Sequence, residues 1–189
     1  MQRTLKVRLA VMGGMIFAAV FARLIPHPPN FAPISAMALF AGAHFDRRLF
    51  AFAVPLAAML LSDAVFELLF GWGFHANLPA VYASFAAIVA LGFVLRGRTR
   101  PTVVVGASLT ASTLFFAVTN VSVFLTSPLY PKTATGLGAC FVAALPLFGN
   151  TVAGDLFYTG VLFGSFALAA RRFPLLRPAA LRIASHTGS

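Results

Sequence analysis

Acidic residues are scarce in this sequence. Only four of its 189 residues are Asp or Glu, whereas 14 are Lys or Arg, which leaves a formal net charge of +10. Charged residues make up 10% of the chain and hydrophobic residues 60%, and the mean hydropathy is +0.91. Soluble domains carry about 25% charged residues. The composition therefore excludes an ordinary soluble domain and predicts an integral membrane protein, with the bilayer rather than nucleic acid as its partner.

Cysteine and the common ligand-binding motifs are also missing or nearly so. Cys140 is the single cysteine, which excludes an internal disulfide, and no CxxC pair or Cys/His spacing typical of zinc sites occurs. The chain has no Walker loop, no HExxH motif and no nucleophile elbow. We therefore expect no metal and no cofactor, and energy from ATP would have to come through another subunit.

Long apolar runs fill most of the chain. One bilayer crossing needs about 20 predominantly apolar residues, and basic or turn-forming segments divide this sequence into six such runs. We predict an all-α fold, a single polytopic membrane domain over residues 1–189 with a short interfacial or re-entrant helix before the last span. The predicted spans are 9–25, 31–45, 49–70, 78–95, 101–125 and 150–170, the short helix is Thr135–Leu147, and residues 171–189 form a basic tail.

Basic residues alternate from side to side in this layout. Two basic residues lie on one side of the spans: Arg23, near the end of the first span, and Lys132, in the loop after the fifth. The other twelve flank the opposite ends of the spans. Basic residues in short loops concentrate on the cytoplasmic side of a membrane. We therefore expect both termini in the cytoplasm. Cleavage after residue 22 as a signal peptide would remove one crossing and disturb this pattern.

Two of the four acidic residues lie in one apolar run. Asp63 and Glu67 are four residues apart, so a helix places them on one face. A carboxylate at membrane depth is costly unless it faces a partner or a watery cavity, which makes both residues candidates for a functional site. The alternative interpretation is a structural pairing with a buried hydroxyl group or an arginine.

The remaining polar residues predict a chamber. Most fall in the outer halves of the spans or in the outer loops, and few fall in the inner halves. A channel would need polar positions through the whole depth, so we expect a chamber open to the outside and closed toward the cytoplasm. The alternative is that these residues cap helices and pair with one another. The candidate substrate-binding residues are Asp63, Glu67, Asn120, Asn150, Asp155, Arg23, His27, Asn30, Trp72, His75, Tyr130 and Lys132.

Each type of side chain suggests a role in that chamber. The carboxylates would bind cationic or hydrogen-donating groups, and the asparagines would orient a ligand by paired hydrogen bonds. Arg23 or Lys132 would meet a carboxylate or phosphate. Trp72 and Tyr130 would stack on a ligand or form a lid, although an interfacial aromatic belt explains them equally well.

The first span carries small residues at every fourth position. They are Ala10, Gly14, Ala18 and Ala22. Such a stripe lets a second helix approach closely in lipid, where van der Waals packing drives helix association. The stripe therefore predicts packing against a partner helix, or against another helix of the same domain.

Several motifs resemble a known family. Residues 23–33, 38–42, 61–63, 130–133 and 150–157 are similar to segments of an uncharacterised family of bacterial six-helix membrane proteins classed as transport proteins. More distantly, the chain resembles the substrate-binding S components of energy-coupling factor (ECF) vitamin transporters. That resemblance implies a six-helix domain in the bacterial inner membrane, which captures a vitamin-like molecule from outside and docks through its first helix onto a coupling subunit with ATPases.

These observations favour a membrane transport protein that binds a small organic molecule and works with a separate energising module. A membrane-embedded enzyme that uses Asp63 and Glu67 as acid and base is the first alternative. A histidine would assist the pair, but this alternative is less favoured because no nucleophile elbow, HExxH or other catalytic signature occurs. A structural membrane subunit, in which the same two carboxylates pair with another chain, is the second.

Overall fold

The computed structural model describes residues 2–71 and 73–176, with side chains from Lys6 onward. All regular structure in this part of the chain is helical. The elements are α1 (Gln2–Leu24), α2 (Ile34–His44), α3 (Arg48–Phe70), α4 (Leu78–Gly92), η1 (Phe93–Leu95), α5 (Pro101–Thr126), α6 (Ala134–Arg172) and η2 (Pro174–Leu176).

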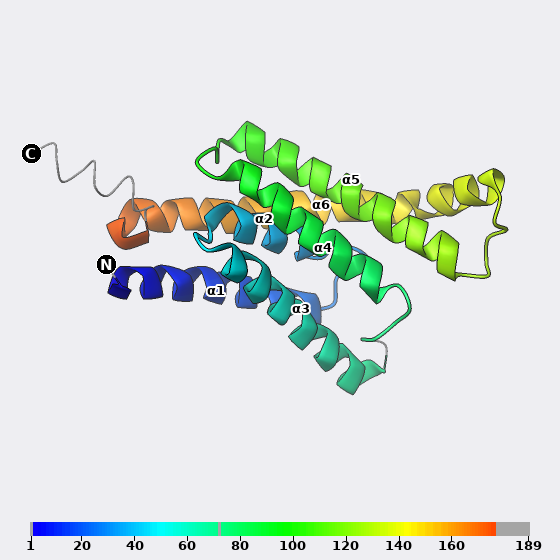
Figure 1. Ribbon diagram of the computed structural model, residues 1–189, viewed down its shortest axis with the longest axis horizontal. Helices are drawn as coiled ribbons and strands as arrows, with labels where there is room; N and C mark the ends of the chain where they lie inside the picture. The colour runs from blue at the N-terminus through cyan, green and yellow to red at the C-terminus, as the bar shows by residue number, and fades with distance from the viewer. Residues whose placement is uncertain (1, 72, 177–189) are drawn as a thin grey trace, which may run out of the picture.

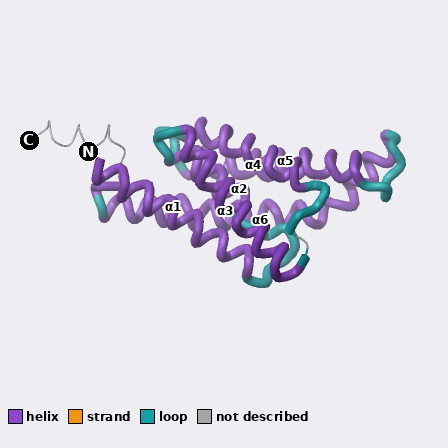
Figure 2. Tube along the Cα trace, turned by 60° about the horizontal axis from the view of Figure 1, so that its bottom comes forward, coloured by secondary structure: helices purple, strands orange, loops and turns teal. Residues whose placement is uncertain are grey.

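The helices form an elongated bundle in which consecutive helices run in opposite directions (Figure 1). The start of α1 and the end of α6 therefore lie at the same end, and the loops gather at the two ends of the bundle (Figure 2). Within residues 2–71 and 73–176, five helices are long and apolar enough to cross a membrane: α1, α3, α4 with η1, α5 and α6. The prediction of an all-helical protein with several helices long and apolar enough to cross a membrane is thereby confirmed.

The second predicted span, 31–45, differs from the others. Its helix α2 has 11 residues, which at 1.5 Å per residue gives a length of about 16 Å, half of the about 30 Å of a bilayer core. Residues Ser35–Gly42 are all buried, because α2 lies among α3, α4 and α6. The apolar run at 31–45 thus packs inside the protein, as a short central helix that is not long enough to cross.

Two arginines from other segments hold the C-terminal end of α2. The Arg96 guanidinium donates to the carbonyl oxygens of Gly42 (3.0 Å) and Phe45 (2.7 Å). Arg8 donates to the His44 carbonyl (2.9 Å) and forms an ion pair with Asp46 (2.7 Å). The last carbonyl groups of a helix have no partner within the helix. These arginines supply partners, which allows α2 to end inside the bundle.

The close approach of α2 to α4 depends on two glycines. A Cβ added at Gly42 would overlap the Val89 carbonyl oxygen, and one added at Gly92 would lie 2.6 Å from the Leu39 carbonyl oxygen. Small residues at such a contact let two helix backbones pack directly against each other. The buried α2 is thereby fixed against α4.

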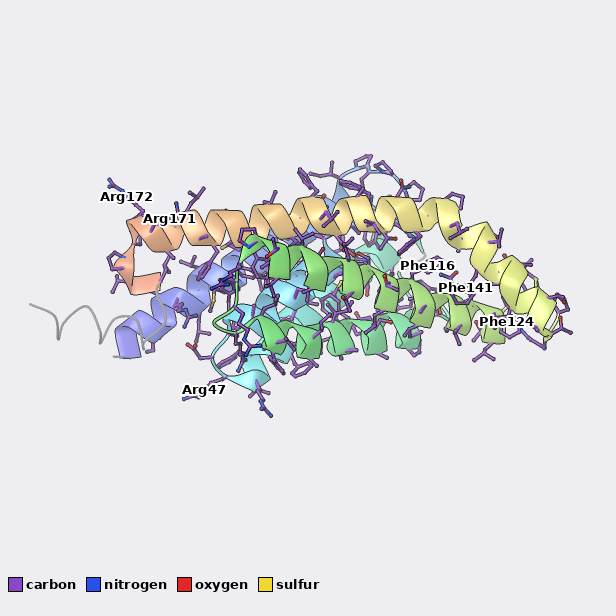
Figure 3. The ribbon with its side chains drawn as sticks, turned by 90° about the horizontal axis from the view of Figure 1, so that it is seen from above. Arg47, Phe116, Phe124, Phe141, Arg171 and Arg172 are labelled. Atoms are coloured by element: carbon purple, nitrogen blue, oxygen red, sulfur yellow. The ribbon has the colours of Figure 1, made fainter. Side chains whose placement is uncertain are left out.

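The last part of the chain departs from the prediction. A separate short helix at Thr135–Leu147 and a span beginning at 150 were expected, but α6 is one continuous helix from Ala134 to Arg172. Pro146 lies inside it, and a proline within a helix removes one hydrogen bond and bends the axis without ending the helix. Figure 3 shows α6 bent in its N-terminal part.

The two ends of the bundle differ in charge. Arg47, Arg171 and Arg172 lie at the same end in Figure 3, together with the start of α1. We call it the basic end. The opposite end, here called the loop end, carries the loops that join α1 to α2, α3 to α4 and α5 to α6.

Candidate functional site

A cavity of about 550 Å³ opens at the loop end. The end of α1, the loop to α2, the first turn of α2 and parts of α3, α5 and α6 form its walls. The lining residues are Arg23, Leu24, Ile25, Pro26, His27, Pro29, Asn30, Ala32, Ile34, Ser35, Phe66, Phe70, Phe115, Thr151 and Asp155. Its size falls within the range of about 300–1,000 Å³ that small-molecule sites occupy.

Asp155 supplies a buried carboxylate to this cavity. Its residue exposure is 2%. Ser112 of α5 donates its hydroxyl to Asp155 Oδ2 at 2.6 Å, and Ser35 of α2 gives a second hydrogen bond. Helix α6 thus presents this carboxylate between α2 and α5, with its orientation fixed from both sides. Hydrogen bonds to a charged acceptor are among the stronger ones in proteins.

Arg23 lies at the rim of the cavity and is held by α3. Its guanidinium donates to Asp63 Oδ1 at 3.0 Å and to the Ser62 hydroxyl, and it lies 5.4 Å from the centre of the Phe66 ring. Tyr82 of α4 donates to the other carboxylate oxygen, Asp63 Oδ2, at 2.8 Å. Both oxygens of Asp63 are therefore engaged by protein groups. The alternative reading of Asp63, pairing with an arginine and a hydroxyl, describes its contacts.

The loop between α1 and α2 covers one side of the cavity and is fixed to α6. The Asn150 amide donates to the Pro29 carbonyl oxygen at 3.0 Å. The Phe31 ring packs against the Tyr158 ring with centroids 5.7 Å apart. A Cβ added at Gly154 would lie 3.1 Å from the Phe31 Cα, so the loop backbone rests directly on α6. Asn150 acts on the site through this loop and does not itself line the cavity.

A second cavity of about 260 Å³ adjoins the first. The two share Asn30, Phe115 and Thr151 in their linings. The smaller one is lined by Asn30, His75, Asn77, Val81, Phe115, Phe116, Thr119, Asn120, Val123, Ala144, Leu147 and Thr151. Its polar side chains are amides, hydroxyls and one histidine, without a carboxylate or an arginine.

The bend of α6 lies beside this second cavity. The Phe116 ring of α5 packs against the Phe148 ring in a tilted arrangement, with 4.6 Å between the centroids. It meets the Phe141 ring edge-on, at 5.5 Å. Both partners belong to α6 and flank Pro146. Figure 3 labels Phe116 and Phe141 in this region. The aromatic contacts connect the bent part of α6 to α5 at the loop end.

Three of the other expected site residues lie outside both cavities: Glu67, Tyr130 and Lys132. Glu67 accepts a hydrogen bond from the Phe74 backbone N–H at 3.0 Å and so holds the loop after α3. Lys132 donates to the carbonyl oxygens of Phe124 and Ser127 at the end of α5. Tyr130 is half-buried in the following loop. Trp72 lies outside the described residues.

A comparison with protein families gives one match. The model of a family of unknown function, DUF6580, matches residues 3–179 of the chain. The chain belongs to DUF6580. No curated protein and no solved structure matches it. For this DUF6580 protein, the geometry of the site is therefore the main guide to function.

Sequence reasoning placed Arg23, His27, Asn30 and Asp155 of this DUF6580 protein in a site, and all four line the larger cavity. His75 and Asn120 line the smaller one together with Asn30. The sequence reasoning missed the polar lining residues Ser35, Thr119, Thr151 and Asn77 and the supporting residues Ser112 and Tyr82.

One of these missed residues, Thr151, could be connected to the site by its spacing in the sequence. Thr151 and Asp155 are four residues apart on α6, which puts them on one helix face. Hydroxyl residues are frequent in apolar helices, where they bond to the carbonyl four residues earlier, as Thr151 does with Leu147 at 3.0 Å. The spacing was therefore not distinctive by itself.

The arrangement of this DUF6580 protein also bears on metal binding and on acid–base catalysis. Within residues 2–71 and 73–176, no three His, Cys, Asp or Glu side chains gather as a metal site would require. The Asp63 and Glu67 pair that an enzyme would use is bound to Arg23, Tyr82 and the Phe74 backbone.

The small residues of α1 face outward. Ala10, Gly14 and Ala18 are exposed and Ala22 is half-buried. A Cβ added at Gly14 would meet nothing within 4 Å. The stripe therefore does not mediate helix packing within the described part of the chain, and it leaves a shallow apolar face on the outside of α1.

Proposed function

We propose that this protein is a substrate-binding membrane transport protein that holds a small, vitamin-like or other polar organic molecule in the larger cavity. The single observation that carries this proposal is the cavity itself, about 550 Å³ in volume, with the buried carboxylate of Asp155 in its wall. Concave, mostly apolar sites with a few well-placed polar groups are typical of small-molecule binding. An ionisable group inside a membrane domain is costly to bury, and it is therefore a functional-site candidate.

The distribution of charge supports an orientation for this transporter. The arginines of the basic end would lie in the cytoplasm by the positive-inside rule, and the cavity at the loop end would open to the extracytoplasmic side of a bacterial inner membrane. Both termini would then be cytoplasmic. In this orientation the protein would capture its ligand from outside.

A separate module would supply the energy. The sequence carries no nucleotide-binding loop, so transport driven by ATP would need a partner with ATPases. Normal uptake in cells that lack every such partner would favour transport by this protein alone. The exposed small-residue stripe of α1 offers a face on which a helix of an ECF-type coupling subunit could pack closely. The resemblance to S components agrees with a substrate-binding protein that works with a separate energising module.

The experiment that tests the proposal has two parts. Molecules extracted from the purified protein are identified by mass spectrometry, and uptake of the molecule so identified is then measured in cells. Ala32 lines the cavity, so Ala32→Phe should fill it and abolish both retention and uptake. Ala153 is exposed on the outside of α6, and Ala153→Phe is the matched control that should leave both unchanged.

Two results would contradict the proposal. Equal uptake by cells with Ala32→Phe and with native protein would remove the cavity from transport. Chemical conversion of the retained molecule by the purified protein alone would instead favour a membrane-embedded enzyme.

A further inference from the structure

The charges that line the larger cavity do not balance. Arg23 and Asp155 carry the opposite charges in its wall. Arg23 already has the carboxylate of Asp63 at 3.0 Å. Asp155 is hydrogen-bonded to the neutral hydroxyls of Ser112 and Ser35. It belongs to neither the Arg23–Asp63 nor the Arg8–Asp46 ion pair. The carboxylate of Asp155 is the charge that a ligand could balance.

The first turn of α2 offsets only part of that charge. Ile34 and Ser35 begin α2, and both line the cavity. The N-terminus of a helix carries a partial positive charge, and Ser35 in this first turn contacts the carboxylate of Asp155. That partial charge is not a full counter-ion for a buried carboxylate. A cationic group placed in the cavity would neutralise it.

The apolar walls suit a cation as well. Phe66 and Phe70 of α3, with ring centroids 5.9 Å apart, and Phe115 of α5 line the cavity. Phe115 is three residues from Ser112, so it lies one turn from the group that bonds Asp155. The faces of aromatic rings attract organic cations, and the attraction is larger when the cation is desolvated. The ring faces offer no such attraction to an anion.

We infer that the larger cavity selects an organic cation, a molecule whose ammonium or protonated ring nitrogen lies against Asp155 and whose apolar or aromatic body packs on the phenylalanines. The inference rests on the proposed function, because it names the ligand class of the same cavity. It also changes the role of Arg23. With its charge paired to Asp63, Arg23 shapes the rim and does not act as the anion-binding group.

The test compares three probes with the same indole body and different charge. They are tryptamine (a cation), indole-3-propionamide (neutral) and indole-3-propionate (an anion), measured by equilibrium binding to the full-length protein in nanodiscs of uncharged phosphatidylcholine. Native protein should bind tryptamine at least about tenfold more tightly than the anion, a difference of about 1.4 kcal/mol.

A matched pair of variants assigns the preference to one carboxylate. Asp155→Asn keeps the size of the side chain and the acceptor for Ser112, and it should weaken tryptamine binding about tenfold while leaving the neutral amide within about twofold. Glu67→Gln removes a carboxylate at the same end of the bundle that lies outside both cavities, and it should leave all three probes unchanged.

Several outcomes would overturn the inference. They are tighter or equal binding of the anion, no binding of any probe, and an unchanged charge preference in Asp155→Asn. If Asp155→Asn does not fold, the order of the three probes on native protein decides the question. Failure of the proposed function is separate, since it appears as the absence of a retained molecule and of uptake, whatever the charge of the probes.

Discussion

Arg23 and Asp63 form an ion pair of 3.0 Å that joins the end of α1 to α3 at the rim of the larger cavity. The side chains are 13% and 5% exposed, so the pair is largely removed from solvent. The Ser62 and Tyr82 hydroxyls complete its hydrogen bonds. Three helices, α1, α3 and α4, thus meet at one charged cluster.

Breaking this pair should destabilise the protein. Asp63→Leu leaves a buried guanidinium without its counter-ion, which costs about 3–5 kcal/mol when a buried partner is removed. The double variant Arg23→Met with Asp63→Leu should lose less than the single variant, because it leaves no unpaired charge. Thermal unfolding of the three proteins in the same detergent measures the difference. A single variant as stable as the native protein would show that the pair contributes nothing.

Asn150 should control how firmly the loop over the cavity is held. Asn150→Leu removes the hydrogen bond to the Pro29 carbonyl, worth about 1 kcal/mol, while keeping the size of the side chain. We expect faster hydrogen exchange across residues 25–33 and ligand release accelerated about fivefold. Thr113→Val is the control, since Thr113 is exposed and bonds only within its own helix. Unchanged exchange in Asn150→Leu would remove the loop contact from the account.

The orientation in the membrane can be tested by labelling with a maleimide that does not cross membranes. Cys140 is first replaced by alanine, and single cysteines are placed at Leu129, which is 79% exposed at the loop end, and at Arg98, which is exposed at the basic end. Spheroplasts should be labelled at Leu129→Cys, and at Arg98→Cys only after permeabilisation. The reverse pattern would place the cavity on the cytoplasmic side.

The outer face of α1 gives a prediction about assembly. Gly14→Leu adds bulk where nothing lies within 4 Å, so the fold and ligand binding should persist. Copurification of a coupling subunit should be lost. Gly160→Leu on α6 is the matched control, because an added Cβ there also meets nothing within 4 Å. Loss of the partner in both variants, or in neither, would contradict a docking role for α1.

The long helices could be predicted from the sequence because apolar runs closed by basic residues are a local signal. The shortness of α2 could not. A run of apolar residues has the same sequence pattern whether it faces lipid or protein. The groups that bond the last carbonyls of α2 come from distant parts of the sequence, since Arg96 lies 54 residues from Gly42. The bend of α6 was misread for a related reason. Pro146 and Gly149 look like a break in a sequence, yet packing against α5 lets the helix continue.

The site was predicted in part. Asp155 and Arg23 attract notice as rare charges in apolar surroundings, and both line the cavity. Asp63 attracts notice for the same reason, but its partner Arg23 lies 40 residues away, a distance that no local pattern reveals. The hydroxyl groups of Ser35, Ser112 and Thr151 escaped the sequence reasoning because serine and threonine are common in membrane helices.

The central claim is that the larger cavity holds a small organic molecule. The most direct measurement is native mass spectrometry of the intact protein, released from nanodiscs without added ligand. The account predicts an additional small mass on the native protein and on Ala153→Phe, and its loss from Ala32→Phe. A mass that stays bound to folded Ala32→Phe would contradict the claim, because the molecule would then bind somewhere other than this cavity.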